Sequence, residues 1–219
     1  MDRILELEVM DDPAQAVAYA RADFAEVNQA FVDRFRAAFP EFAAGRLVDL
    51  GCGPADIPIR LARALPAVHV TGVDASKPML ELAREAVAAA GLAARIFLVE
   101  GRLPGLPLPA GGFDAVVCNS LVHQLPDPAP FWQEVRRLGR HAAAVLVVDL
   151  FRPDTPAAAR AIVERYSGGE DPIMKRDFYN SLCAAFTPHE VAGQLRAAGL
   201  AHLKAEVISD RHWAVSGRL

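Results

Sequence analysis

The sequence predicts an α/β domain in which a mostly parallel sheet has helices on both faces. From Gly45 onward, short apolar stretches alternate with amphipathic ones, which is typical of parallel strands connected by helices. A long helical pattern precedes the first of these strands. Near the C-terminus, two strand patterns are separated only by Ser209 and Asp210, and so short a gap allows a hairpin but no crossover helix. The last strand is therefore expected to run antiparallel to the others.

Composition and charge indicate a single globular domain. Of the 219 residues, 53% are hydrophobic and 23% are charged, as in globular proteins of one-domain size. The net charge of -4 gives no general attraction to nucleic acid or to anionic membranes. The longest apolar run is far shorter than a membrane span, and the acidic N-terminus is unlike a signal peptide, so we expect a cytoplasmic protein. The cysteine spacing fits neither a disulfide framework nor a zinc site, and no metal is expected.

The first predicted element is an amphipathic helix. Between Pro13 and Phe39, apolar residues recur every three or four positions, as on one face of a helix. Asp12 is a suitable N-cap and Pro13 a suitable first helical residue. The pattern allows one break within this region.

Strands and helices then alternate. The stretches that predict strands are 46–50, 68–74, 95–99, 113–119 and 142–151, and the helical patterns between them are 55–65, 76–90 and 128–139. Ser76 is a suitable N-cap and Gly91 a suitable C-terminal residue for the second of these helices. A helical insert follows over 153–186, and the next helix opens with a capping box formed by Thr187 and Glu190.

The stretch LVDLGCGPAD, residues 47–56, begins like a nucleotide-binding turn. Gly51 and Gly53 stand where the fingerprint G-x-G-x-x-G has its first two glycines, but Asp56 stands in the third place. Glycines at such a turn let a ligand approach the backbone amides at a helix N-terminus. On their own, they fit equally well a turn that only connects a strand to a helix.

Two carboxylates narrow the choice of ligand. Asp49 ends the first strand beside this turn, where it would repel a pyrophosphate but suit a cationic amino-acid or sulfonium group. Asp74 ends the second strand, where an acidic side chain can accept hydrogen bonds from both hydroxyls of a ribose. Together with the terminal hairpin, these residues favour a ligand without a pyrophosphate.

With these features, the sequence resembles a known family. Four stretches occur in the order and at the strand ends typical of the class I S-adenosylmethionine-dependent methyltransferases, especially the small-molecule branch that includes the ubiquinone/menaquinone-biosynthesis type. They are LVDLGCGPAD, VTGVDASKPMLELAR, LPLPAGGFDAVVCNSLVHQLPDP and VLVVDLFRP. The resemblance covers about residues 46–152 and the terminal hairpin.

The resemblance implies a Rossmann-like three-layer sandwich with a seven-stranded, mostly parallel sheet and an antiparallel last strand. The chain would be one methyltransferase domain, with an N-terminal helical cap (1–44), a cofactor-binding core (45–152), a helical lid (153–186), and a last helix with the C-terminal hairpin (187–219). S-adenosyl-L-methionine would be the cofactor, and its methyl group would pass by in-line displacement to a small-molecule acceptor. A homodimer is left open, whereas no nucleic-acid or membrane partner is expected.

The resemblance also implies which residues bind the cofactor. The assignments are Asp49, Gly51, Gly53 and Asn119 at the methionine part, Asp74 at the ribose, Ala75, Met79, Arg102 and Leu103 at the adenine, and Tyr19 over the cofactor. Arg102 departs from the family pattern, in which an Asp commonly accepts a hydrogen bond from the adenine amino group, because arginine has no acceptor. Adenine recognition would then depend on backbone groups at 101–103 or on Glu100.

Two residues are candidates for the chemistry. Methyl transfer needs alignment of the acceptor and exclusion of water more than a fixed set of catalytic groups. An acceptor that must lose a proton needs a base, and histidine is the first choice by its pKa. His123, after the fourth strand, is therefore a candidate catalytic residue, with a purely structural role in the loop as the alternative. Tyr179, on the polar face of the lid, is the second candidate and would contact the substrate.

The sequence leaves two other functions open. An NAD-type oxidoreductase is disfavoured by the absent third glycine, by Asp49 and by the terminal hairpin. A cofactor-binding or regulatory protein that keeps the fold without catalysis is allowed by the change at Arg102.

Overall fold

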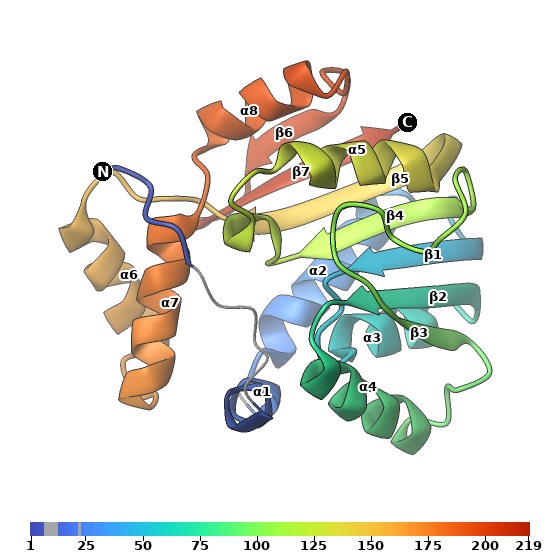
Figure 1. Ribbon diagram of the computed structural model, residues 1–219, viewed down its shortest axis with the longest axis horizontal. Helices are drawn as coiled ribbons and strands as arrows, with labels where there is room; N and C mark the ends of the chain where they lie inside the picture. The colour runs from blue at the N-terminus through green and yellow to red at the C-terminus, as the bar shows by residue number, and fades with distance from the viewer. Residues whose placement is uncertain (7–12, 22) are drawn as a thin grey trace.

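A mixed sheet forms the centre of the computed structural model, which describes residues 1–6, 13–21 and 23–219 (Figure 1). Within these residues the sheet has seven strands in the order β3-β2-β1-β4-β5-β7-β6. The strands are β1 (Ala44–Leu50), β2 (Ala67–Asp74), β3 (Ile96–Glu100), β4 (Phe113–Asn119), β5 (Gly139–Leu150), β6 (Lys204–Val207) and β7 (His212–Arg218). β7 lies between β5 and β6 and is antiparallel to both, whereas the other neighbouring strands are parallel. The predicted seven-stranded sheet with an antiparallel last strand is confirmed.

Helices cover both faces of this sheet. In the described part of the chain they are α1 (Pro13–Arg21), α2 (Ala25–Ala38), α3 (Asp56–Ala64), α4 (Lys77–Ala89), the short 3-10 helix η1 (Val122–Gln124), α5 (Ala129–Leu138), α6 (Pro156–Ser167), α7 (Pro172–Ala184) and α8 (Pro188–Ala197). Buried residues of α2, α3 and α4 pack on one face of the sheet, and those of α5 and α8 pack on the other. α6 and α7 stand beyond the carboxyl ends of the parallel strands (Figure 1). The fold is the predicted three-layer sandwich.

β1 illustrates how the apolar sequence builds two cores. Leu47 belongs to the same buried cluster as Phe35 of α2, whereas Val48 and Leu50 belong to the cluster on the other face with Trp132 of α5. Successive side chains of a strand point to opposite faces of a sheet. A strand that is buried on both faces therefore reads as a continuous apolar run in the sequence.

The N-terminal helical pattern forms two helices rather than one. α1 ends at Arg21 and α2 begins at Ala25. The carboxylate of Asp23 accepts a hydrogen bond from the backbone N–H of Ala25 at 3.0 Å, and such an acceptor favours a new helix start because it satisfies an otherwise unpaired donor. The break that the pattern allows is thus present. The expected N-cap, Asp12, lies outside the described residues.

The predicted capping box begins α8. The Thr187 hydroxyl accepts from the N–H of Glu190 at 3.3 Å, and the Glu190 carboxylate accepts from the N–H of Thr187 at 2.7 Å. The same carboxylate pairs with the guanidinium of Arg152 at 2.8 Å. Arg152 also donates to the carbonyl of Ala185 at 2.8 Å, so this cap connects α8 to the end of α7.

Replacing Thr187 by alanine is expected to lower the free energy of unfolding by about 1 kcal/mol, because α8 loses the acceptor for its N–H group at Glu190. For a chain of this size, such a loss corresponds to a fall in Tm of about 2–4 °C, which calorimetry can measure. Thr155→Ala is the matched control, since Thr155 caps α6 through Ala158 N at 3.1 Å without a reciprocal partner, and a smaller loss is expected. Unchanged stability of Thr187→Ala would contradict the proposed contribution of the capping box.

The lengths of the helices, the grouping of metal-binding side chains and the state of the cysteines also bear on function. In the part of the chain that the structure describes, no helix is long and apolar enough to cross a membrane. Over the same residues, no group of three or more His, Cys, Asp or Glu side chains is arranged to hold a metal ion. The three cysteines, Cys52, Cys118 and Cys183, are buried and form no disulfide.

Candidate functional site

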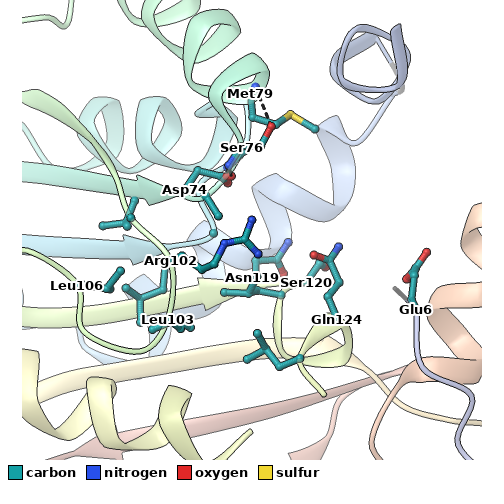
Figure 2. Close-up of a pocket in the computed structure, with 18 of the residues that line it drawn as sticks. Glu6, Asp74, Ser76, Met79, Arg102, Leu103, Leu106, Asn119, Ser120 and Gln124 are labelled. Carbon is teal, nitrogen blue, oxygen red and sulfur yellow. Dashed lines mark hydrogen bonds between the residues drawn. The ribbon is translucent and has the colours of Figure 1, made fainter. Parts of the chain in front are cut away.

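The candidate site is a cavity of about 340 Å³ at the carboxyl ends of β1, β2 and β4 (Figure 2). β1 pairs with β2 on one side and with β4 on the other, so the strand order reverses here, and open α/β sheets bind ligands at such a reversal. The residues assigned from the sequence that line this cavity are Tyr19, Gly51, Gly53, Asp74, Ala75, Met79, Arg102, Leu103 and Asn119. The structure thus brings nine assigned residues together. Asp49, His123 and Tyr179 lie elsewhere.

The turn after β1 has the backbone that its glycines predict. Gly51 and Gly53 have φ angles of 78° and 51°, in the left-handed region that disfavours side chains with a Cβ. A Cβ on Gly51 would come within 3.0 Å of the Leu121 side chain, whereas a Cβ on Gly53 would meet nothing within 4 Å. Gly51 therefore permits close packing within the protein, and the backbone at Gly53 is open to a ligand.

Asp74 is held in place by the turn that it faces. One carboxylate oxygen accepts from the N–H of Gly53 at 2.8 Å, and the other accepts from the N–H of Ser76 at 2.9 Å. Ser76 is itself the N-cap of α4, where its hydroxyl accepts from Met79 N at 3.3 Å. The carboxylate is therefore fixed between the glycine turn and the start of α4, at the edge of the cavity.

Asp49 lies beneath the turn and does not line the cavity. Its side chain is 1% exposed, and its Oδ1 atom has no hydrogen-bond partner among the described residues. Burial, reinforced by the negative charge of Asp74, raises the pKa of Asp49 to about 8. A buried acceptor without a partner is costly, and a cation bound above it would stabilise its ionised form. This unpaired oxygen fits the positively charged methionine part of the expected cofactor.

The adenine end is formed by the start of α4 and by the loop after β3. Figure 2 shows Met79 above this end and Arg102 reaching into the cavity toward Asn119. Glu100, the alternative acceptor for the adenine amino group, pairs instead with Lys77 at 3.8 Å and is half-exposed. The backbone at 101–103 thus remains the candidate for reading the adenine edge.

Tyr19 of α1 also lines the cavity. Its ring centroid is 4.9 Å from that of Phe24. Burial, together with the charge of Asp74, raises the pKa of its hydroxyl to about 12, so this hydroxyl stays protonated at neutral pH. The covering role that the resemblance implies for Tyr19 stays a prediction.

The opposite end of the cavity is formed by the loop after β4 and by the N-terminal segment. Ser120, Gln124, Leu125 and Pro126 come from this loop, and Glu6 comes from the segment. In Figure 2, Glu6 and Gln124 lie at the side of the cavity away from Asp74. Sequence reasoning missed Glu6, because it lies in no periodic pattern and in no motif.

Arg3 holds the N-terminal segment against the protein. Its guanidinium donates to the backbone carbonyls of His123 at 2.9 Å, Leu125 at 2.8 Å and Ala184 at 2.5 Å, and it stacks 3.8 Å from the centroid of the Phe186 ring. Hydrogen bonds to a charged donor are stronger than neutral ones. One side chain thus joins the segment to both the β4 loop and α7.

His123 lies behind the wall of the cavity and is 4% exposed. Its Nδ1 atom is 2.6 Å from Oδ1 of Asp149, and its backbone N–H donates to Oδ2 of the same carboxylate at 3.1 Å. Burial lowers the pKa of His123, but the charge and hydrogen bond of Asp149, with Glu6 in addition, outweigh this effect and raise it above the ordinary value. The contact with Asp149 orients the ring so that Nε2 faces Glu6. The Nε2 atom lies 3.9 Å from Oε2 of Glu6.

Tyr179 of α7 does not line the cavity. It is partly buried against the cluster that contains Leu182 and Val163, and the guanidinium of Arg160 lies 5.9 Å from its ring centroid. A hydrogen bond with Cys183 raises the pKa of its hydroxyl.

Comparisons of the sequence with known proteins agree with this geometry. A family model described as "Methyltransferase domain" matches residues 47–142. The chain is 31% identical over 175 residues to a ubiquinone/menaquinone biosynthesis C-methyltransferase, UbiE, of Methylobacterium nodulans, which covers 75% of this chain and 69% of that protein. It is 28% identical over 189 residues to a 27-O-demethylrifamycin SV methyltransferase of Amycolatopsis mediterranei, over 86% of this chain and 66% of that protein.

A solved structure supports the fold independently. The solved structure of a protein of Methanococcus maripaludis superposes with a TM-score of 0.75 at 20% identity, over 97% of this chain and 95% of that one. The chain spans about two thirds of the length of the two curated relatives above and about half of a demethylmenaquinone methyltransferase of Lactiplantibacillus plantarum.

Three findings indicate the same protein family. They are the strand order, the glycine turn beside Asp49 and Asp74, and the match to UbiE. They leave the NAD-type oxidoreductase without support and indicate S-adenosyl-L-methionine as the cofactor. The chain belongs to the class I S-adenosylmethionine-dependent methyltransferases.

Proposed function

We propose that the protein transfers a methyl group from S-adenosylmethionine to a small molecule that enters at the Glu6 end of the cavity. The main support is that one cavity runs from the Asp74 carboxylate to Gln124 and Glu6. A cofactor anchored by its ribose at Asp74 would direct its methionine part along Gly51 and Asn119. The acceptor would then approach from the remaining end, as in-line displacement requires.

The proposed cofactor contacts are those assigned from the sequence. They are Tyr19, Gly51, Gly53, Asp74, Ala75, Met79, Arg102, Leu103 and Asn119, which line the cavity, and Asp49, which does not line it and would act on the cofactor through its charge. The buried, unpaired oxygen of Asp49 supports a cationic methionine part. The protein's task in such a reaction is to align the acceptor and exclude water, while the sulfonium supplies the reactivity.

A small-molecule acceptor is supported by the relatives and by the charge of the chain. The curated relatives are described as acting on a rifamycin and in ubiquinone and menaquinone biosynthesis. The net charge of -4 offers no general attraction to nucleic acid.

Two measurements test this function. Isothermal titration calorimetry with S-adenosylmethionine should give saturable heat, whereas NAD should give none; the absence of heat with the sulfonium would refute the assignment of the cofactor. An assay with S-adenosylmethionine labelled in its methyl group, run over fractions of pooled metabolites, should then give a labelled product. Binding without transfer to any fraction would favour a regulatory protein of the same fold.

A further inference from the structure

We propose that Glu6 is the carboxylate that takes the proton from the methyl acceptor and passes it to His123. This inference rests on the proposed methyl transfer, and it assigns the base to the N-terminal segment, outside the motif-bearing core. It also narrows the acceptor to a molecule whose nucleophilic atom carries a removable proton, such as a hydroxyl or an amine.

The first support is the position of Glu6 relative to the cavity and to His123. Glu6 lines the cavity, whereas His123 does not and is almost fully buried. The Oε2 atom of Glu6 lies 3.9 Å from Nε2 of His123 and accepts a hydrogen bond from the hydroxyl of Ser181 at 3.0 Å. A proton that leaves a bound acceptor therefore meets Glu6 before it can reach the histidine.

The second support is that several contacts hold Glu6 at this place. Arg3 attaches the segment to the carbonyls of His123 and Leu125, and the N–H of Ile4 donates to the carbonyl of Cys183 at 3.1 Å. Ser181 holds the carboxylate itself. A catalytic group needs such support, because a displacement of about 1 Å can cost a large factor in rate.

The third support is the set of charges around His123. Asp149 of β5 binds Nδ1, Glu6 faces Nε2, and Arg3 is the cation of the same segment. The two carboxylates stabilise the protonated ring and outweigh both burial and Arg3, so the pKa of His123 lies above its ordinary value. His123 is thus suited to hold a proton received from Glu6, with Asp149 balancing the charge.

The acceptor's nucleophilic atom forms a bond to the methyl carbon, while the electron pair of the broken carbon–sulfur bond remains on sulfur. The acceptor's proton moves to the Glu6 carboxylate and then to Nε2 of neutral His123, whose own proton stays on Nδ1 toward Asp149. The relay therefore needs the neutral ring, and it needs Oε2 and Nε2, which are 3.9 Å apart, to approach to hydrogen-bond distance. When the product leaves, the proton returns through Glu6 to solvent. An anionic phosphate or carboxylate acceptor would face the charge of Glu6 in a partly desolvated site and is disfavoured.

The contact between Glu6 and His123 can be tested without cofactor or acceptor. In protein with ¹⁵N-labelled histidine, an NMR titration should give a His123 pKa about one unit lower in Glu6→Gln than in the wild type, because the variant removes a charge about 4 Å away. His123→Gln identifies the signal. Glu85→Gln, at an exposed position of α4, is the matched control and should leave the pKa of His123 unchanged. Glu6→Asp, which keeps the charge on a shorter side chain, should give an intermediate value.

The catalytic role is tested by kinetics with the metabolite fraction that supports labelled-methyl transfer. Glu6→Gln should reduce kcat about 100-fold or more, as expected for loss of a positioned base, while its calorimetric affinity for S-adenosylmethionine stays within a factor of two or three of wild type. An unchanged His123 pKa, or an unchanged kcat, would overturn the proposal. If the wild type transfers to no fraction, the proposed function fails, and the histidine titration still decides whether the Glu6–His123 contact exists.

Discussion

Replacing Asp74 by alanine is expected to weaken S-adenosylmethionine binding about 100-fold or more. The proposed role of Asp74 is to accept hydrogen bonds from the ribose hydroxyls, and each hydrogen bond to a charged group contributes about 1.5–3 kcal/mol. The variant also removes the acceptor for Gly53 N, so the glycine turn loses its fixed position. Both effects lower affinity, and isothermal titration calorimetry measures their sum.

Two further variants separate these effects. Asp74→Asn keeps the shape of the side chain but removes its charge and one of its acceptor oxygens, and it should weaken binding less than alanine does. Asp33→Ala, at an exposed position of α2, is the control and should bind the cofactor as the wild type does. A dissociation constant for Asp74→Ala within threefold of wild type would show that the ribose is bound elsewhere.

The second large effect is a pH dependence of cofactor affinity that originates at Asp49. Because the pKa of Asp49 is about 8 in the free protein, the carboxyl group is mostly protonated at neutral pH. A cationic ligand favours its ionised form, so binding should release a proton below about pH 8. Affinity should therefore increase by up to about tenfold per pH unit as the pH approaches 8 from below, and should level off above it.

Calorimetry in two buffers of different ionisation enthalpy checks this prediction, since a released proton makes the observed heat depend on the buffer. Asp49→Asn cannot ionise, so it should bind with an affinity that varies little between pH 6 and 8.5, and more weakly than wild type at the upper end. A wild-type affinity that is flat over this range would contradict the high pKa of Asp49 or its proximity to the cation.

The raised pKa of Asp49 also makes the stability of the fold depend on pH. The pKa of Asp49 in the folded protein, about 8, lies above its ordinary value of 3.8, so the folded state holds the proton more tightly than the unfolded chain does. This stabilisation is complete below about pH 4 and is lost as the pH rises through about 8. Asp49→Asn cannot ionise, so it should lack this pH-dependent stabilisation. Between about pH 4 and pH 8, the free energy of unfolding of the variant should therefore decline less than that of the wild type.

Much of the fold could be predicted from the sequence because the local signals agree with the tertiary structure. Strands buried on both faces appear as apolar runs, and helices α4 and α8 begin at residues whose side chains cap them. Parallel strands place their carboxyl ends at one edge, so Gly51, Asp74 and Asn119 could be expected to meet. The structure places all three around one cavity.

The acceptor end could not be predicted in the same way. Glu6 belongs to a segment without helical or strand periodicity, and its place depends on Arg3 contacts with carbonyls more than a hundred residues away. Asp149 did give a signal, since it is a charged residue inside an apolar strand. Its partner depends on the tertiary structure, because the pairing of β4 with β5 brings Asp149 beside His123.

The fixed carboxylate of Asp74 has a thermodynamic consequence. Its oxygens are already bonded to the N–H groups of Gly53 and Ser76, so this side chain has little rotational freedom left to lose when a ribose arrives. Freezing a mobile side chain at a binding site costs about 0.5–1.5 kcal/mol. The entropy loss on cofactor binding should therefore come mainly from the ligand, and hardly from the ribose-binding groups.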